Sequence, residues 1–277
     1  MYAYNGSVPG PALRIGRGRT LRVRLKNRLD VDTTVHWHGI RIANAMDGVP
    51  ELTQDPVAPG AEFEYEFAVP DAGTYWYHSH RFSFEQVERG LYGLLIVDEE
   101  QPYPVDRDIP LVVDDWRLTG DGAIDPSFGD LHDVSHAGRL GNWITVNGAS
   151  LPDIDVATGE RVRLRVANTA NARIVTLHLR DLAPWVIALD GQPVAPFVLT
   201  GGKLTLAPGQ RTDLVVDIAT PPGARTPIDL VDPRGVLTIA HLSARGDTGT
   251  ARNGPPPPCP PIRSTRTSTS APRFAPS

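Results

Sequence analysis

The sequence has a single cysteine, Cys259, among its 277 residues. One thiol excludes an internal disulfide framework and any zinc site built from cysteines. No apolar run reaches the roughly 18 residues of a membrane-spanning helix, and the net charge of −5 indicates no nucleic-acid-binding surface. Met1 is followed by Tyr-Ala-Tyr-Asn-Gly, without the basic and apolar regions of a secretory leader. We therefore expect no membrane span, no nucleic-acid partner and no signal peptide in this chain.

Short segments that alternate apolar and polar residues dominate the chain up to about residue 243. Examples are residues 21–25, 63–67 and 162–166. This alternation predicts strands with one buried and one exposed face, and four Pro-Gly pairs punctuate them as turns. Long helical periodicity is missing, and only residues 84–89 suggest a helical turn. The sequence therefore predicts an all-β protein of sandwich or barrel domains.

The chain also repeats itself at a spacing of about half its length. Residues 18–27 (GRTLRVRLKN) resemble residues 159–168 (GERVRLRVAN), 141 positions later. The pair Asn5-Gly6 likewise recurs as Asn147-Gly148, 142 positions later. Such a long period predicts a duplicated domain rather than a solenoid. We expect domain one at residues 1–99 and domain two at residues 108–243.

Residues 244–277 differ in composition from the two repeats. They are rich in Pro, Arg, Ser and Thr, and Ile262 and Phe274 are their only large apolar residues. Such a segment buries too little apolar surface to offset its ordering entropy, so we expect a disordered tail. Two interpretations stay open for the tail: a basic Pro-rich recognition segment, or a frameshift product, which we favour.

Two pairs of histidines carry most of the chemical information in the sequence. They lie in His36-Trp37-His38 and in His78-Ser79-His80. On a strand, residues i and i+2 point to the same face, so two such strands brought together present four imidazoles. This ligand set suits copper, zinc, iron or nickel. The alternative is ordinary hydrogen-bonded strand histidines, but two pairs in one domain, set among aromatic residues, favour a metal site.

The motifs around these histidines resemble a known family. Residues 36–39 (HWHG) and 72–80 (AGTYWYHSH) are similar to copper-ligand motifs of the multicopper oxidases, the laccase and cuprous oxidase group. The resemblance extends over about residues 2–243, with supporting segments at residues 4–11, 90–97, 142–148 and 186–193. It implies two cupredoxin-like (plastocyanin-like) Greek-key domains in tandem, the first carrying copper ligands and the second carrying none.

The resemblance also implies roles for individual residues. His36 would ligate a type 2 copper, and His38, His78 and His80 would ligate a type 3 copper pair. Asp47 matches an acidic residue that assists proton delivery to dioxygen, although Asp47 with the following glycine also suits a simple turn. The implied reaction couples one-electron oxidation of a reducing substrate to reduction of O2 to water. We expect Trp37 and Ser79 to belong to the core.

Part of the family's machinery has no counterpart in this sequence. A type 1 copper needs a cysteine flanked by histidines, whereas Cys259 lies in a run of prolines. We therefore expect half a trinuclear site, no type 1 site, and no activity of this chain alone. His132 and His136 would suit a metal if helical, but the surrounding Gly, Asp and Ser favour a loop. His178 and His241 read as plain strand residues.

Four alternatives to a truncated oxidase exist. The chain could be a non-catalytic two-domain copper-binding or interaction scaffold, or a subunit completed by a separate third cupredoxin-like domain. Two-domain oxidases and copper nitrite reductases both need a cysteine ligand that this chain does not offer. By family, the parent protein is expected to be periplasmic or secreted.

Overall fold

The computed structural model describes residues 1–247, 249, 252 and 254–262, and within them strands dominate, as predicted. The strands are β1 (Gly10–Gly16), β2 (Thr20–Lys26), β3 (His36–His38), β4 (Glu62–Ala68), β5 (Gly73–His78), β6 (Tyr92–Asp98), β7 (Arg107–Trp116), β8 (Trp143–Val146), β9 (Asp153–Thr158), β10 (Arg161–Asn168), β11 (Val175–Leu179), β12 (Trp185–Leu189), β13 (Gln192–Val198), β14 (Lys203–Leu206), β15 (Arg211–Asp217), β16 (Arg225–Asp232) and β17 (Gly235–Asp247). The helices are short: α1 (Ser83–Gln86), α2 (Leu131–Ser135) and two 3-10 turns, η1 (Asn44–Met46) and η2 (Thr200–Gly202). No helix in this part of the chain is long and apolar enough to cross a membrane.

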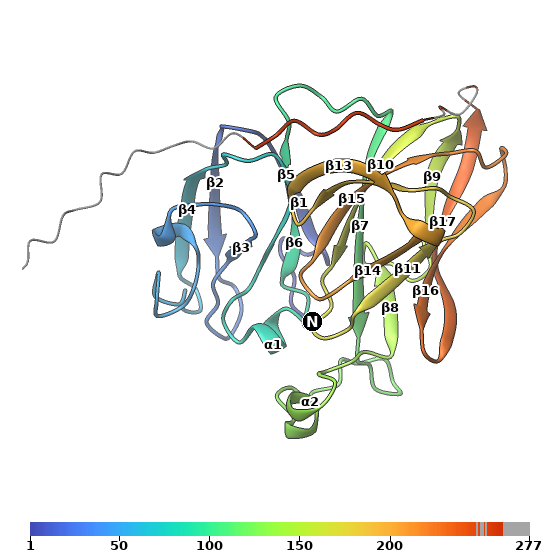
Figure 1. The fold of residues 1–277 in the computed structure, drawn as a ribbon. Coiled ribbons are helices and arrows are strands. Elements are labelled where there is room, and N and C mark those ends of the chain that lie inside the picture. The colour runs from blue at the N-terminus through green and yellow to red at the C-terminus, as the bar shows by residue number, and fades with distance from the viewer. Residues whose placement is uncertain (248, 250–251, 253, 263–277) are drawn as a thin grey trace, which may run out of the picture.

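The strands fall into two groups that lie side by side (Figure 1). Strands β1–β6 form a four-stranded sheet in the order β1-β6-β5-β3 and a two-stranded sheet, β2-β4. Strands β7–β17 form a six-stranded sheet, β13-β12-β15-β10-β7-β8, and a five-stranded sheet, β14-β11-β16-β17-β9. Within the described residues, no strand of the first group pairs with one of the second. The pairing is compatible with the predicted boundaries near residues 99 and 108, which stay a prediction.

Strand β2 follows its sequence pattern closely. It pairs antiparallel with β4, and the register sets Leu21 opposite Phe67. Both side chains are buried in the core of the first group, against Trp37. On the opposite face Arg24 pairs with Glu64 at 3.1 Å in solvent. The alternation therefore predicts β2 correctly, with one face buried and one exposed.

Strand β10 has the same alternation but is buried on both faces. The side chains of Arg163 and Arg165 are 1% and 0% exposed, so the predicted exposed face of residues 162–166 is wrong. On that face the guanidinium groups meet Thr74 of the first group and Glu99 at the start of the connection between the groups. They also meet Asp108 of β7 and Asp213 of β15, the strands on either side of β10. Arg165 Nε lies 2.7 Å from Asp108, and Arg163 Nη2 lies 2.6 Å from Asp213.

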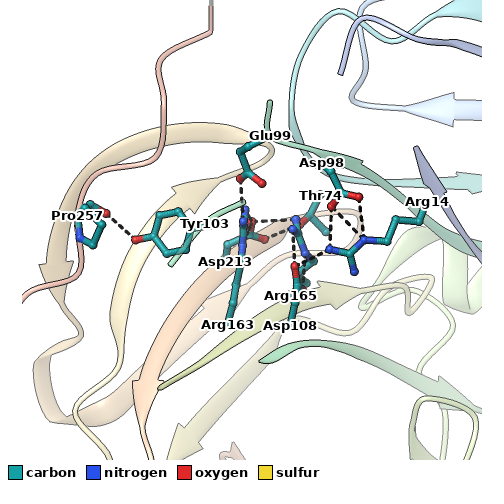
Figure 2. A network of polar contacts seen from close by, with 10 residues as sticks. All are labelled: Arg14, Thr74, Asp98, Glu99, Tyr103, Asp108, Arg163, Arg165, Asp213 and Pro257. Carbon is teal, nitrogen blue, oxygen red and sulfur yellow. Dashed lines mark hydrogen bonds and ion pairs between the residues drawn. The ribbon is translucent and has the colours of Figure 1, made fainter. Parts of the chain in front are cut away.

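These arginines belong to a polar network that joins the two groups of strands (Figure 2). From the first group, Thr74 accepts a hydrogen bond from Arg165 at 2.9 Å. Arg14 bridges Asp98 of the first group, at 2.7 Å, and Asp108 of the second, at 2.9 Å. Buried charges of this kind are tolerated because each one faces an opposite charge and its hydrogen bonds are made.

Residues 244–247 and 254–262 are ordered, which differs from the predicted disorder. Strand β17 continues to Asp247, and residues 254–262 run across the edge of both groups (Figure 1). The Tyr103 hydroxyl donates to the carbonyl of Pro257 at 2.5 Å, and Cys259 is only 6% exposed beside it. Sequence reasoning counted large apolar side chains and so missed backbone carbonyls that accept hydrogen bonds from the domain surface. Residues 248, 250–251, 253 and 263–277 of the predicted tail lie outside the described residues.

Candidate metal centre

The two histidine pairs come together on neighbouring strands, as predicted. In the antiparallel pair β3-β5, His36 lies opposite His78 and His38 lies opposite Trp76. One ring nitrogen each of His36, His38 and His78 lies within 4.8 Å of the other two. His80 follows the end of β5 rather than lying on a strand, contrary to expectation, but its ring centroid is still 5.2 Å from that of His36. Four imidazoles therefore converge, and three of them form a tight triad.

His36 is oriented by the loop that follows η1. Its Nδ1 lies 2.8 Å from the backbone carbonyl oxygen of Asp47 and 3.3 Å from the Asp47 carboxylate. Since a carbonyl only accepts, Nδ1 carries the proton and Nε2 keeps its lone pair for a metal. Gly48 makes this approach possible: its φ is +75°, and a Cβ there would collide with the carbonyl of Val35. Asp47 thus combines the two suggested features, a turn and a carboxylate beside the cluster.

His78 is held in the same manner from the other strand. Its Nδ1 lies 2.8 Å from the carbonyl oxygen of Ser79, which leaves Nε2 unprotonated. That Nε2 faces His38 Nδ1 at 3.4 Å. Trp76 packs against both rings, with centroid distances of 4.2 Å to His78 and 5.1 Å to His38. Backbone carbonyls therefore orient two rings of the triad, and Trp76 packs beneath His38 and His78.

Burial keeps these rings neutral near pH 7. Desolvation, followed by the charge of Arg211, lowers the pKa of His38 to about 4. Desolvation likewise lowers the pKa of His78 to about 3, and burial together with His36 lowers that of His80. The neutral imidazole is the form that binds a metal, so protons compete weakly for these nitrogens.

The triad opens on a cavity of about 720 Å³ between the two groups of strands. All four histidines line it on one side, and loops of the second group, including Thr169 and Gly209, line it on the other. A Cβ on Gly209 would come within 3.3 Å of the His38 ring, so this turn seats closely on the histidine. The sequence predicts Pro208-Gly209 only as a turn and Trp76 only as part of the aromatic surroundings of the histidines, and nothing in it indicates Arg211. Nothing local in the sequence indicates that a turn some 170 residues away reaches His38.

The residues between the histidines belong to the core, as expected. Trp37 is buried against Tyr65 and Phe67, with centroid distances of 5.5 and 5.0 Å. Ser79 is buried and donates to Gln86 Oε1 at 2.6 Å, tying the chain after β5 to α1. Neither side chain lies among those lining the cavity.

The remaining histidines lie elsewhere. His178 lies on β11 and His241 on β17, so both are strand residues as predicted. His132 and His136 lie on and just after α2, so the predicted loop is wrong there. The side chain of Asp130 caps this helix by accepting from the His132 N–H at 2.8 Å, a signal that was available in the sequence.

Comparison with known proteins relates both halves of the chain to one family. Residues 1–102 and residues 108–224 each match a family model described as multicopper oxidase. Curated relatives include a copper resistance protein A homolog of Pseudomonas syringae pv. tomato, 28% identical over 87% of this chain and 52% of that protein. Another is the multicopper oxidase mco of Staphylococcus epidermidis, 32% identical over 89% of this chain and 55% of that protein.

Solved structures give the same picture. A multi-copper oxidase from Pseudomonas thermotolerans superimposes with a TM-score of 0.87 at 37% identity, covering 94% of this chain and 62% of that one. Lac15 from a marine microbial metagenome has a TM-score of 0.81 at 41% identity, covering 94% and 65%. The two cupredoxin-like domains expected from the resemblance agree with these neighbours. The chain spans about half the length of the curated relatives it matches.

Proposed function

This chain belongs to the multicopper oxidase family, and from that premise we propose that it supplies the first half of a copper site for the reduction of O2 to water. The observation that carries the proposal is the convergence of His36, His38 and His78, with ring nitrogens within 4.8 Å of one another, and of His80 beside them. We assign His36 to a type 2 copper and His38, His78 and His80 to a type 3 pair.

The donor set fits copper. Four imidazoles, with neither a thiolate nor a carboxylate in the triad of His36, His38 and His78, suit a borderline metal and not magnesium or calcium. The carbonyls of Asp47 and Ser79 fix the tautomers of His36 and His78, so Nε2 is the free donor in each. Bound copper would supply one-electron chemistry, with O2 as the acceptor and a reducing substrate as the donor.

Asp47 is the proton carrier that this half of the site offers. Reduction of O2 to water consumes protons as well as electrons, so a carboxylic acid at the cluster would assist by general acid catalysis. The Asp47 carboxylate is 3.3 Å from His36 and partly exposed, so it can exchange protons with solvent. Its position depends on the left-handed turn at Gly48, whose φ is +75°.

The open side of the cavity favours a partner domain. Hydrophobic side chains are exposed there: Phe84 lines the cavity at 50% exposure, and Val134 lines it at 74%. An exposed apolar rim around a polar site is typical of a protein interface. We propose that a third cupredoxin-like domain, covalently linked or separate, covers this face and brings the type 1 copper. On the same family basis we place the parent protein in the periplasm or outside the cell.

A non-catalytic copper-binding role is the second candidate. It is favoured by the position of Cys259, whose thiol packs against Tyr103, Ile187 and Val215 and not against the histidine cavity. Within the described residues no other thiol is available as a type 1 ligand.

Copper loading of the full chain separates these possibilities. We expect the double variant His36→Ala/His78→Ala to lose the Cu(II) held in the cavity and so to bind less Cu(II) than the parent. His178→Ala, a histidine change on a strand away from the cavity, should bind as much Cu(II) as the parent. The loaded chain should show no intense blue thiolate absorption and no O2 uptake with a phenol or cuprous ion. Copper binding by the cavity variant equal to that of the parent would contradict the proposed metal centre. Turnover by this chain alone would contradict the proposal that a further domain must bring the type 1 copper.

A further inference from the structure

We propose that His132 and His136 form a second metal site, on α2, that binds Cu(II) at the surface of the protein. His132 lies on α2 and His136 is the residue that follows it, so the single turn between them brings the two side chains to the same side. Their ring centroids lie 4.2 Å apart with an interplanar angle of 27°, and both side chains are exposed. This site rests on its own residues and does not depend on the proposed oxidase function.

The hydrogen bonds around His136 leave its Nε2 free to bind a metal. Its Nδ1 lies 3.0 Å from the carbonyl oxygen of His132 and 3.0 Å from Ser135 Oγ. The Ser135 hydroxyl already donates to the carbonyl of Leu131 at 2.7 Å, so both neighbours of Nδ1 act as acceptors. Nδ1 must therefore carry the proton, and Nε2 presents its lone pair to solvent. Metal-ligating histidines usually bind the metal through one ring nitrogen and donate the N–H of the other to a carbonyl or carboxylate.

The helix itself is anchored, which reduces the entropy lost on binding. Asp130 caps its first turn, and Arg117 holds Asp133 through two hydrogen bonds of 2.6 and 3.0 Å. Arg117 is fixed in turn by the carbonyl of Leu140 at 3.0 Å. α2 lies at the tip of the connection between β7 and β8 (Figure 1). A short helix would fray in isolation, but these contacts preserve the spacing of the two imidazoles.

The site is distinct from the histidine cavity and prefers copper. Asp133 and Val134 of α2 line the cavity, whereas neither His132 nor His136 does. Two imidazoles with water in the remaining positions suit the tetragonal geometry of Cu(II). Cu(II) also forms stronger complexes with nitrogen ligands than the neighbouring divalent ions Ni(II) and Zn(II).

Titration of the full chain with Cu(II) tests the site. In a background where the cavity histidines are replaced by alanine (His36, His38, His78 and His80), we expect one Cu(II) still to bind with nitrogen hyperfine structure in its electron paramagnetic resonance spectrum. Removing either His132 or His136 should weaken that binding by about 100-fold, because the second imidazole no longer acts at high effective concentration. His241→Ala is the matched control and should change nothing.

One outcome of this titration would contradict the proposed site. If His132→Ala/His136→Ala binds Cu(II) with unchanged stoichiometry and affinity in that background, the site does not exist. Circular dichroism and thermal unfolding of each variant verify folding, and because α2 is exposed its alanine variants should unfold like the parent. Tighter binding of Zn(II) than of Cu(II) would also overturn the assignment.

Discussion

Gly48 is the residue on which the geometry of His36 depends most directly. Its φ of +75° lies in the left-handed region, and a side chain would collide with the Val35 carbonyl. Gly48→Ala should therefore displace the Asp47 carbonyl from His36, lower copper affinity, and lower the free energy of unfolding by more than the about 1–2 kcal/mol of left-handed strain. Copper titration and urea unfolding measure the two effects.

Gly60 provides the matched control for that substitution. Its φ is +78°, but a Cβ there meets nothing within 4 Å. In Gly60→Ala the free energy of unfolding should fall only by the left-handed strain, and copper binding should stay complete. Equal losses in both variants would mean that the close approach at Val35 is unimportant.

Glu88 makes stability depend on pH. Burial, opposed by Arg139 and supported by Asp115, raises its pKa from 4.5 to about 7. A carboxyl group with a raised pKa in the folded state is most favourable below pH 4.5, and its contribution is lost as pH rises through 7. The loss amounts to about 3 kcal/mol between pH 4.5 and 7.5. Glu88→Gln should remove this slope and be more stable than the parent at pH 8.

Urea unfolding across that pH range measures the difference. The exposed Glu100→Gln should retain the parent's slope and serves as the control. Parallel pH profiles for Glu88→Gln and the parent would show that Glu88 is already ionised in the folded protein at pH 5.

The convergence of individual histidines could be predicted from sequence because its signal is local. The i, i+2 spacing placed His36 and His38 on one face of a strand, and the structure agrees. The supporting contacts could not be predicted in this way. Arg211 and Gly209 approach His38 only because the second group of strands packs against the first, and no local pattern encodes that packing.

At the scale of elements, β2 and β10 have the same sequence pattern in different surroundings. Arg24 on β2 faces water, whereas Arg165 on β10 is 0% exposed between Asp108 and Asp213. Alternation predicts which residues share a face, and it cannot tell whether that face meets solvent or another sheet. The strand itself was therefore predictable, and its burial was not.

Paired substitutions on these two strands measure the difference. Arg165→Met removes one of the two arginines that face each of Asp108 and Asp213 and leaves them with Arg14 and Arg163, so we expect a loss of about 1.5–3 kcal/mol in the free energy of unfolding. Arg24→Met removes an exposed ion pair and should stay within about 0.5 kcal/mol of the parent. Urea unfolding followed by tryptophan fluorescence gives both values. A small effect at Arg165 would indicate that the network in Figure 2 contributes little to joining the two groups.

At the scale of the whole molecule, residues 254–262 form a strap across both groups of strands. Arg161 donates to the Gly254 carbonyl at 2.9 Å, while Pro260 and Ile262 lie beside Arg17 of the first group. This contact could not be predicted from the sequence, because docked and unfolded segments share a proline-rich composition.

The thiol of Cys259 reports whether the strap is docked. Burial raises its pKa from 9.0 to about 11, which reduces the thiolate fraction at pH 8 by about 100-fold. Labelling with Ellman's reagent should therefore be at least that much slower than for a free cysteine. Tyr103→Phe, which removes the hydrogen bond to Pro257, should accelerate it, and Tyr2→Phe should not. Rapid labelling of the native parent chain would contradict docking.

The parallel pairing of β1 with β6 constrains how the chain is made. β1 ends at Gly16, but its partner is completed only at Asp98, so the nascent strand has no hydrogen-bonding neighbour in its own sheet while roughly 80 further residues are synthesised. At the usual pace of ribosomes this interval lasts roughly 4–16 s. In the same way β9 has no partner in its sheet until β17 is synthesised. During translation each half therefore exposes an unpaired strand edge until its last strand emerges, and this interval is when chaperones would protect the chain from aggregation.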